Sequence, residues 1–284
     1  MKNVIIIVVY NDYETTYKLI HNIKEYSILD EIIIVDNHSS NESYKKLLGL
    51  QSDRISVIQS GANKGYAYGM NIGSHYAIKK YGKCNIIFSN ADIVIDKEED
   101  IRNLIELLES NPSYGIVAPV IREHEGLNRG WKIPSPFQDA LLNILYIHRI
   151  LRPKLLFYKD SYYKGIVEVG AVSGCFFCMN SKTLQDVNFF DENTFLYYEE
   201  NIIAKKLHKK GYKVMLQSGV SVFHNHAVII DKNIHSIKKF KILKQSQLYF
   251  QTEYNHANIL EKGLLQVTTY LSLCVLYIIS LIKR

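Results

Sequence analysis

Residues 85–92 read Asn-Ile-Ile-Phe-Ser-Asn-Ala-Asp, a short run of β-favouring residues that ends in polar side chains. Similar apolar runs precede it at 4–9, 32–36 and 55–59, and segments of helical periodicity separate them. Strands that alternate with helices in this way are typical of a parallel sheet with crossover helices. The sequence therefore predicts an α/β fold of the nucleotide-binding kind, with a mixed, mainly parallel sheet flanked by helices.

The same pattern continues on both sides of this stretch. We expect helices and strands in the following order: helices at roughly 13–26, 43–50, 68–81 and 98–110, a strand at 115–121, a strand at 167–179, a helix at 199–210 and a strand pair around 213–223. Regularity fades between residues 122 and 168, and we interpret this segment as the acceptor side. It contains Trp131, the only tryptophan. Residues 1–230 are predicted to form one domain.

The composition is that of a folded globular protein, with 47% hydrophobic and 22% charged residues and only 5 prolines among 284 residues. The formal charge of +6 suits anionic partners such as nucleotides or lipid headgroups, but it is too small to indicate nucleic acid. The N-terminus does not resemble a secretory signal, and the four cysteines are scattered. We therefore expect a cytoplasmic protein.

Cys175 and Cys178 have the spacing of a metal-binding or redox pair. They lie in an apolar run that reads as a strand, where residues three apart point to opposite faces of the sheet. We therefore expect buried free thiols rather than a shared metal ligand set.

The C-terminal residues 231–284 change character, from the basic stretch 232–244 to nineteen uncharged residues at 264–282. A membrane span needs about 20 apolar residues, and several hydroxyl and amide side chains interrupt this one. We favour a helix that lies on the membrane surface over one that spans the membrane or one that packs or oligomerises. This extension predicts peripheral contact with the inner face of the cell membrane.

Acidic side chains follow the second and fourth predicted strands, and ligands of open α/β sheets bind at the carboxyl ends of strands. Asp36 is suited to hold a ribose hydroxyl or a base edge, although the residues after Asn37 also read as an ordinary loop with a helix cap. Asp92 is suited to bind Mg²⁺ or Mn²⁺ together with a diphosphate, because such ions need only one or two protein carboxylates. A helix cap is the alternative role for Asp92.

Glycines at 65, 69 and 73 lie on one face of a predicted helix. That spacing permits close approach of a ligand, with Lys64 meeting a phosphate, but it equally suits helix-on-sheet packing. Glu199 and Glu200 begin the later helix and are candidates for a general base, with helix-dipole compensation as the alternative. His224 and His226 face the same side of a strand and could bind Mn²⁺ or be purely structural.

In order along residues 1–227, this set of motifs resembles the family 2 glycosyltransferases, especially the rhamnosyltransferase-like group. The motifs that carry the resemblance are Val9-Tyr10-Asn11, Val35-Asp36-Asn37, Asn63-Lys-Gly with Gly69, Asn71 and Gly73, Asn90-Ala-Asp92, Val172-Ser-Gly-Cys175, Phe190-Asp-Glu, Tyr198-Glu-Glu200 and His224. The resemblance implies a GT-A fold and transfer of a sugar from a nucleotide diphosphate sugar with inversion at the anomeric carbon.

The resemblance also assigns roles to individual residues. Donor contacts fall on Val9, Tyr10, Asn11, Asp36, Lys64, Gly65, Asn71, Asn90 and Asp92, the Mg²⁺ or Mn²⁺ ligands are Asp92 and His224, Ser173 and Gly174 lie where the backbone approaches the substrates, and Glu200 is the base. Trp131, Ser173 and Gly174 are therefore the expected substrate-binding residues. Asn90 replaces the first acid of the usual Asp-x-Asp, and Glu200 replaces an aspartate, which leaves Glu199 as a rival base.

The expected partners are a UDP- or dTDP-linked sugar donor and a saccharide or lipid-linked acceptor of surface polysaccharide synthesis, with an oligomer left open. A dehydrogenase or a sugar-phosphate nucleotidyltransferase would need a glycine-rich loop after the first strand, where this chain has Tyr10-Asn-Asp-Tyr-Glu. The remaining alternative is a non-catalytic member that binds a nucleotide sugar or serves as a scaffold.

Overall fold

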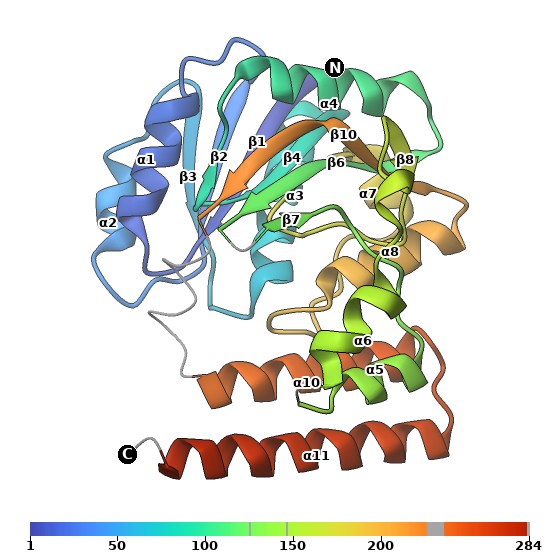
Figure 1. Cartoon of the computed structure of the whole chain (residues 1–284). Coiled ribbons are helices and arrows are strands. Elements are labelled where there is room, and N and C mark those ends of the chain that lie inside the picture. Colours follow the sequence, from blue (N-terminus) through green and yellow to red (C-terminus); the bar gives the residue numbers. More distant parts are fainter. Residues whose placement is uncertain (125, 146, 226–235, 283–284) are drawn as a thin grey trace.

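The structure is a computed structural model that describes residues 1–124, 126–145, 147–225 and 236–282. A central sheet lies between two layers of helices, and a group of helices that includes the C-terminal pair lies below them (Figure 1). The strands are β1 (Lys2–Val9), β2 (Glu31–Asp36), β3 (Ile55–Gln59), β4 (Cys84–Asn90), β5 (Ile93–Val94), β6 (Tyr114–Glu123), β7 (Gly126–Asn128), β8 (Ile166–Glu168), β9 (Phe176–Asn180) and β10 (Lys213–His224).

The helices follow the predicted order, with several additions. They are α1 (Tyr13–Ile23), α2 (Ser43–Leu48), α3 (Tyr66–Tyr81), α4 (Glu98–Ser110), α5 (Pro136–Leu142), α6 (Ile147–Leu156), the 3₁₀ helix η1 (Asp160–Tyr162), α7 (Ser181–Asp186), α8 (Glu199–Lys209), α10 (Ser236–Glu253) and α11 (Ile259–Ile282).

The sheet has the order β3-β2-β1-β4-β9-β6-β10-β5, with β7 paired to β6 and β8 paired to β10. Strands β1 to β4 are parallel, and β10 is parallel to β6. Strand β9 runs antiparallel to both β4 and β6. The predicted mixed, mainly parallel α/β sheet is therefore confirmed.

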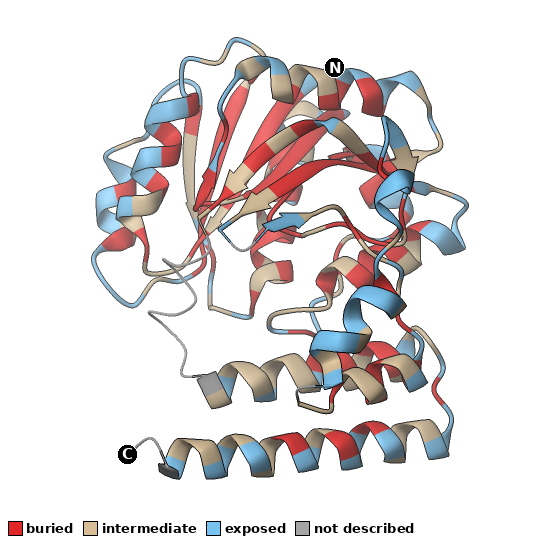
Figure 2. Cartoon of the chain, viewed as in Figure 1, coloured by how far each residue is buried: buried red, intermediate tan, exposed pale blue. Residues whose placement is uncertain are grey.

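Successive side chains of β1 point to opposite faces of the sheet and so belong to two separate hydrophobic cores. The residues of these cores make up most of the buried interior in Figure 2. Ile5 and Ile7 belong to the core that includes residues of α1 and α4. Val4 and Ile6 belong to the core under α3 and α8. Added Cβ atoms on Gly69 and Gly73 would lie 2.5 Å from side-chain atoms of β1, so these glycines serve helix-on-sheet packing.

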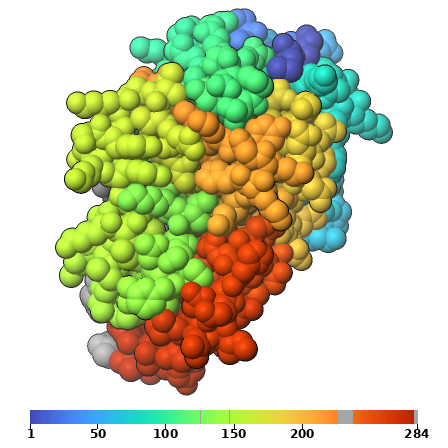
Figure 3. Space-filling view, turned by 90° about the vertical axis from the view of Figure 1, so that its right-hand side faces the viewer, coloured from blue at the N-terminus to red at the C-terminus, as the bar shows by residue number. Residues whose placement is uncertain are grey.

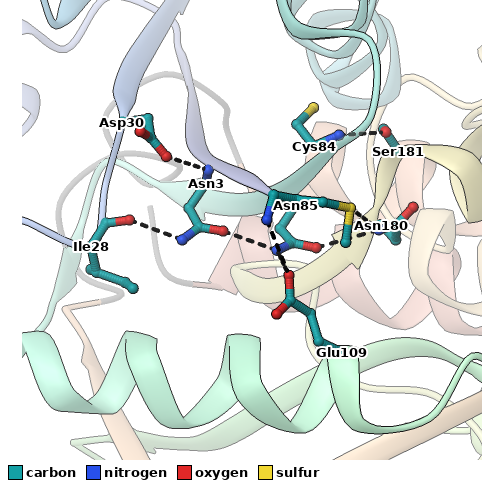
Figure 4. A network of polar contacts seen from close by, with 9 residues as sticks. Asn3, Ile28, Asp30, Cys84, Asn85, Glu109, Asn180 and Ser181 are labelled. Atoms are coloured by element: carbon teal, nitrogen blue, oxygen red, sulfur yellow. Dashed lines mark hydrogen bonds and ion pairs between the residues drawn. The ribbon is translucent and has the colours of Figure 1, made fainter.

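An amide network ties β1, β4 and β9 together (Figure 4). It lies where β1 and β4 begin, at the opposite end of the parallel strands from Asp36 and Asp92. The Asn85 amide donates to Asn3 Oδ1 at 2.9 Å and to Glu109 Oε1 at 2.8 Å, and the side chain of Asn85 is fully buried. Asn180 Nδ2 donates to Asn85 Oδ1 at 3.4 Å. Because buried polar groups are costly unless bonded, this network stabilises the fold at a distance from the site.

Two predicted strands differ from the structure. The run 167–179 is split, because β8 pairs with β10 whereas β9 pairs with β4, and the chain must cross between these positions. At 213–223 there is one strand rather than a pair, since the register against β6 jumps from Gln217 to Ser221 and the residues between them bulge out.

The segment 122–168 is more regular than predicted. Helix α5 begins with a capping box, in which Ser135 Oγ accepts from the Gln138 N–H and the Gln138 side chain accepts from the Ser135 N–H. Pro136 occupies the first turn, where its missing N–H costs nothing. Both signals are visible in the sequence.

Helices α10 and α11 pack together, and α11 packs against α5. In the space-filling view the C-terminal residues, in red, lie directly against the green segment that contains α5 (Figure 3). One face of α11 is buried and the other carries exposed apolar side chains (Figure 2). Residues 259–281 are long and apolar enough to cross a membrane by length and composition alone. The predicted domain boundary at 230 lies outside the described residues.

Candidate active site

Asp36 ends β2 and is fully buried at the carboxyl edge of the sheet. Its Oδ1 accepts hydrogen bonds from the Ser39 N–H at 3.0 Å and from Gln59 Nε2 at 3.3 Å. Its Oδ2 has no hydrogen-bond partner among the described residues. A buried carboxylate oxygen without a partner suits a ligand that brings a donor, such as a ribose hydroxyl or a base N–H.

The loops after β1 and β2 are tied to each other at this edge. The Asn37 N–H donates to Val9 O at 2.7 Å, and the Ser40 N–H donates to Asn11 Oδ1 at 2.8 Å. Asn11 has a φ of 56°, a left-handed conformation that asparagine tolerates. Tyr10, which lies between Val9 and Asn11 in the chain, is partly buried. The end of β1 therefore lies beside Asp36 at the end of β2, with Tyr10 and Asn11 in the loop that follows.

Gly65 brings a third loop to the same place, because Asn37 Nδ2 donates to its carbonyl at 2.9 Å. Gly65 has a φ of 107°, and a Cβ there would lie 2.2 Å from Phe195 O. Only glycine satisfies both constraints. Lys64 is exposed, with its Nζ 5.1 Å from the centre of the Tyr68 ring.

Asp92 and His224 form a buried pair beyond the end of β4. His224 Nε2 lies 3.1 Å from Asp92 Oδ1, and the Asn225 N–H donates to Asp92 O at 2.9 Å. Burial lowers the pKa of His224, but hydrogen bonds to Asp92, Cys175 and Glu123 outweigh it and raise the pKa to about 12. Binding of a cation would therefore release a proton from this imidazole. His226, the second predicted histidine, lies outside the described residues.

The donor set of this pair fits a divalent cation. Asp92 would offer a carboxylate oxygen and His224 an imidazole nitrogen, 3.1 Å apart, and both are ligand types that Mn²⁺ accepts. In the described part of the chain, no group of three or more His, Cys, Asp or Glu is arranged to hold a metal. The protein would therefore supply one carboxylate and one imidazole, and phosphate oxygens and water the rest. The partly buried Asn90 ends β4 two residues earlier.

Glu199 and Glu200 begin α8 after two residues in left-handed conformations, Tyr197 and Tyr198, with φ values of 70° and 67°. The Gly174 N–H donates to Glu200 Oε1 at 3.3 Å. Burial raises the pKa of both carboxyls. The charge of Glu200 raises the pKa of Glu199 further, whereas the backbone N–H bonds favour the ionised form of Glu200. Of the two carboxyls, Glu199 therefore has the pKa that is raised further.

Residues 4–183 match the family described as Glycosyl transferase family 2. The chain belongs to this family. The glycosyltransferase is 27% identical over 224 residues to the Low-salt glycan biosynthesis hexosyltransferase Agl10 of Haloferax volcanii. The aligned region covers 79% of the chain and 67% of that relative.

Two solved structures share the fold of the glycosyltransferase and confirm the predicted GT-A type. GalNAc-T7 with UDP, GalNAc and Mn²⁺ aligns with a TM-score of 0.63 and 15% identity over 90% of the chain, which spans 49% of that structure, about half its length. Mannosyltransferase PcManGT from Pyrobaculum calidifontis with GDP-Man and Mn²⁺ aligns with a TM-score of 0.60 and 15% identity, over 95% of the chain and 69% of that structure.

Tyr66, which was not predicted from the sequence, lies between the two halves of the glycosyltransferase site in the chain, directly after Gly65. Its hydroxyl donates to Gly174 O at 3.3 Å. Burial raises the pKa of this hydroxyl well above its usual value, and the nearby Glu199, Cys175, Asp92 and Glu200 raise it further. Tyr66 is therefore within electrostatic reach of both the Asp92 pair and the glutamate pair. The feature of the sequence that could have indicated Tyr66 is its position directly after Gly65.

Asn71 was predicted to contact the donor, but its side chain is used elsewhere. Its Nδ2 donates to Phe190 O at 3.0 Å and to Glu192 Oε1 at 2.7 Å, and its Oδ1 accepts from the Phe190 N–H at 3.0 Å. With both ends of the amide engaged, Asn71 acts on the site by holding the loop that leads to α8.

The predicted acceptor residues lie around the same glutamates. Trp131 Nε1 donates to Asn201 Oδ1 at 2.9 Å, one residue after Glu200, and the ring is partly exposed. Ser173 Oγ donates to Cys175 Sγ at 3.2 Å. Cys175 and Cys178 are both free and buried, as predicted, although Cys175 precedes β9 instead of lying within it.

Helix α10 braces the loop that presents the glutamates, a connection that the sequence did not indicate. Ser246 Oγ donates to Leu196 O at 2.7 Å, and Gln247 Nε2 donates to Tyr198 Oη at 3.0 Å. The Tyr198 hydroxyl in turn donates to the buried Asp139 Oδ2 of α5 at 2.8 Å. The C-terminal extension is thus bonded directly to the residue before Glu199.

Proposed function

We propose that this glycosyltransferase transfers a hexosyl or deoxyhexosyl residue from a nucleotide diphosphate sugar to a saccharide or lipid-linked saccharide acceptor, with inversion at the anomeric carbon. The observation that carries the proposal is the turn before β9, where the Cys175 carbonyl accepts from the Asn90 N–H at 2.8 Å and the Gly174 N–H donates to Glu200 Oε1 at 3.3 Å. This turn connects the end of β4, which leads to Asp92, with Glu200. A cation-binding pair and a candidate base therefore share one site, as a single displacement requires.

The donor half of the site is the edge around Asp36. The unpartnered Asp36 Oδ2 suits a hydroxyl or N–H of the nucleoside, with Val9, Tyr10 and Asn11 beside it and Lys64 and Asn90 toward the phosphates. Mg²⁺ or Mn²⁺ held by Asp92 and His224 would neutralise the charge that develops on the leaving diphosphate. Mn²⁺ is present in the structures of both fold neighbours. We expect a UDP- or dTDP-linked donor.

Glu200 is our proposed base. The acceptor hydroxyl attacks the anomeric carbon as its proton passes to the Glu200 carboxylate, while the bond from that carbon to the diphosphate oxygen breaks. A base is most effective when its pKa lies near the working pH, and burial moves Glu200 in that direction. The Gly174 N–H orients the carboxylate. Glu199, which retains the proton, is the less suitable of the two.

The acceptor half lies near Trp131, Ser173 and Gly174. Agl10 is named as a hexosyltransferase of glycan biosynthesis, which supports a role in building a glycan. We propose that this glycan is a surface polysaccharide. We place the protein at the inner face of the cell membrane, with the exposed apolar face of α11 on the bilayer. Val267, Leu271 and Ile278 are each 56% exposed and share one face of α11. They form a continuous apolar patch, which marks an interaction surface, whereas single exposed apolar residues would not.

The stereochemistry of the product tests the mechanism. With a productive donor and acceptor, ¹H NMR of the early product is expected to give the anomeric configuration opposite to that of the donor. Retention of configuration would contradict the single displacement on which the role of Glu200 depends.

A further inference from the structure

A pocket of about 320 Å³ lies between α10 and α11, outside the site described above. This volume is within the usual range for small-molecule sites, about 300–1,000 Å³. Its lining divides by chemistry: Lys241 and Lys244 are cationic, whereas Leu248, Leu265 and Leu273 are apolar. No acidic residue lines it in the part of the chain that the structure describes. The pocket therefore suits an amphiphile with an anionic end.

Lys244 is the better placed of the two cations. Its Nζ donates to Asn143 Oδ1 at 2.5 Å, and an ammonium group has two further hydrogens to donate. Burial lowers the pKa of Lys244 to about 8, with Asp139 acting in the opposite direction, so the amine is mostly protonated at pH 7. A charge that is partly removed from water attracts an anion more strongly than an exposed charge does.

The apolar side of the pocket continues onto the exposed face of α11. Tyr270 lines the pocket and is itself 68% exposed. Leu271, its neighbour in sequence, belongs to the apolar face that we place on the bilayer. Lys241 of α10 is exposed, and its Nζ lies 5.6 Å from the centre of the Tyr277 ring of α11. A chain in the pocket could therefore reach the bilayer past the exposed ring of Tyr270.

We propose that this pocket binds a lipid phosphate, with the phosphate against Lys241 and Lys244 and the hydrocarbon chain along Leu248, Leu265 and Leu273. Charge complementarity selects the phosphate, since point-charge lysines are common phosphate ligands and basic pockets beside apolar helices suit lipid headgroups. The role of the ligand rests on the proposed function: it is the carrier of a lipid-linked acceptor.

The pocket wall is bonded to the loop that carries the glutamates. Gln247 lines the pocket, and its Nε2 donates to Tyr198 Oη at 3.0 Å. Tyr198 is the residue immediately before Glu199. A headgroup held in the pocket would thus be held by the same helix that supports the base, which provides a physical route for placing the acceptor saccharide near it.

Calorimetric titration of the full chain tests the proposal with three probes below their micelle concentrations: monododecyl phosphate, dodecyl maltoside and inorganic phosphate. We expect saturable 1:1 binding of dodecyl phosphate, with the other two at least about tenfold weaker, since each lacks one half of the recognition. Inorganic phosphate binding as tightly would identify a site for a free anion. Dodecyl maltoside binding as tightly would identify an apolar surface only. Either result overturns the proposal.

Substitutions assign the binding to the pocket. Lys244→Met and Lys241→Gln are each expected to weaken dodecyl phosphate about tenfold, the scale of one lost charge-assisted bond. Lys238→Gln, an exposed lysine of α10 outside the pocket, is the matched control and should change nothing. Gln245→Glu places a negative charge at the exposed rim and should weaken the phosphate probe alone, even if Lys244→Met fails to fold.

Unchanged affinity in Lys241→Gln and Gln245→Glu would overturn the assignment. Sugar transfer is measured separately on the same preparations. A chain that transfers sugar but binds no dodecyl phosphate contradicts the pocket alone, whereas binding without transfer contradicts the proposed function and leaves the pocket standing.

Discussion

Exchanging each of the two adjacent glutamates for glutamine separates their roles. Glu200→Gln removes the carboxylate that would accept the acceptor proton, but the amide oxygen can still accept the Gly174 N–H, so the fold should persist. General-base contributions are about 10²–10⁴-fold, which corresponds to about 3–5 kcal/mol in the activation barrier. We therefore expect kcat to fall by that factor while the dissociation constant of the donor is unchanged.

Glu199→Gln should behave differently, because burial and the charge of Glu200 raise the pKa of the Glu199 carboxyl, and in our proposal this carboxyl carries the proton that the pair retains. An amide of nearly the same shape then replaces a neutral group. We expect kcat within about fivefold of wild type, or about 1 kcal/mol. The two variants thus differ although they sit side by side in the sequence.

The assay is acceptor-dependent nucleotide release across pH, with donor affinity from calorimetry and folding from circular dichroism. Glu200 is active when ionised and its pKa is raised by burial, so kcat/KM should fall as the pH drops through a value above the usual 4.5. Wild type and Glu199→Gln should share this limb. A large loss in Glu199→Gln with near-normal Glu200→Gln, or equal losses in both, would refute the division of roles.

Four further predictions test the rest of the site and the fold. Asp92→Ala should abolish transfer and the stimulation by Mn²⁺, measured by nucleotide release in a metal titration; transfer that remains metal-stimulated would contradict the ligand assignment. Gly65→Ala, which forces a Cβ against the Phe195 carbonyl, should lose about 2 kcal/mol or more in urea unfolding, whereas Gly61→Ala, whose Cβ would lie at an ordinary contact distance of 4.0 Å from the Tyr68 hydroxyl, should not. Asn85→Ala should cost about 2–3 kcal/mol of stability and leave kcat unchanged, since its network lies at the opposite end of the parallel strands from Asp92. The triple variant Val267→Glu, Leu271→Glu and Ile278→Glu places charges on the exposed face of α11 and should no longer sediment with anionic vesicles. The control Leu127→Glu, on the exposed strand β7, should still sediment with them.

The parallel half of the sheet was predictable because its strands are short, apolar and separated by helices of clear periodicity. Asp36 and Asp92 could be placed at one edge for the same reason: each follows a strand of known direction. The run 167–179 could not be divided correctly, since a continuous apolar run gives no sign that β8 and β9 pair with different strands.

The contacts made by side chains across the fold were the least predictable. The motif around Asn71 was visible, but its bonds to Phe190 and Glu192, more than a hundred residues away, depend on tertiary structure. The same holds for Gln247, whose bond to Tyr198 connects the C-terminal extension to the site. Sequence patterns identify which residues carry suitable chemistry, whereas the fold decides which of them meet.

Nucleotide release from a panel of UDP-, dTDP- and GDP-linked sugars tests the central claim most directly. Purified full-length chain with Mn²⁺ and acceptor is compared with Asp92→Ala under the same conditions. We expect wild type to release the nucleoside diphosphate from at least one donor and Asp92→Ala to release none. No release from any donor, or equal release by both proteins, would contradict it.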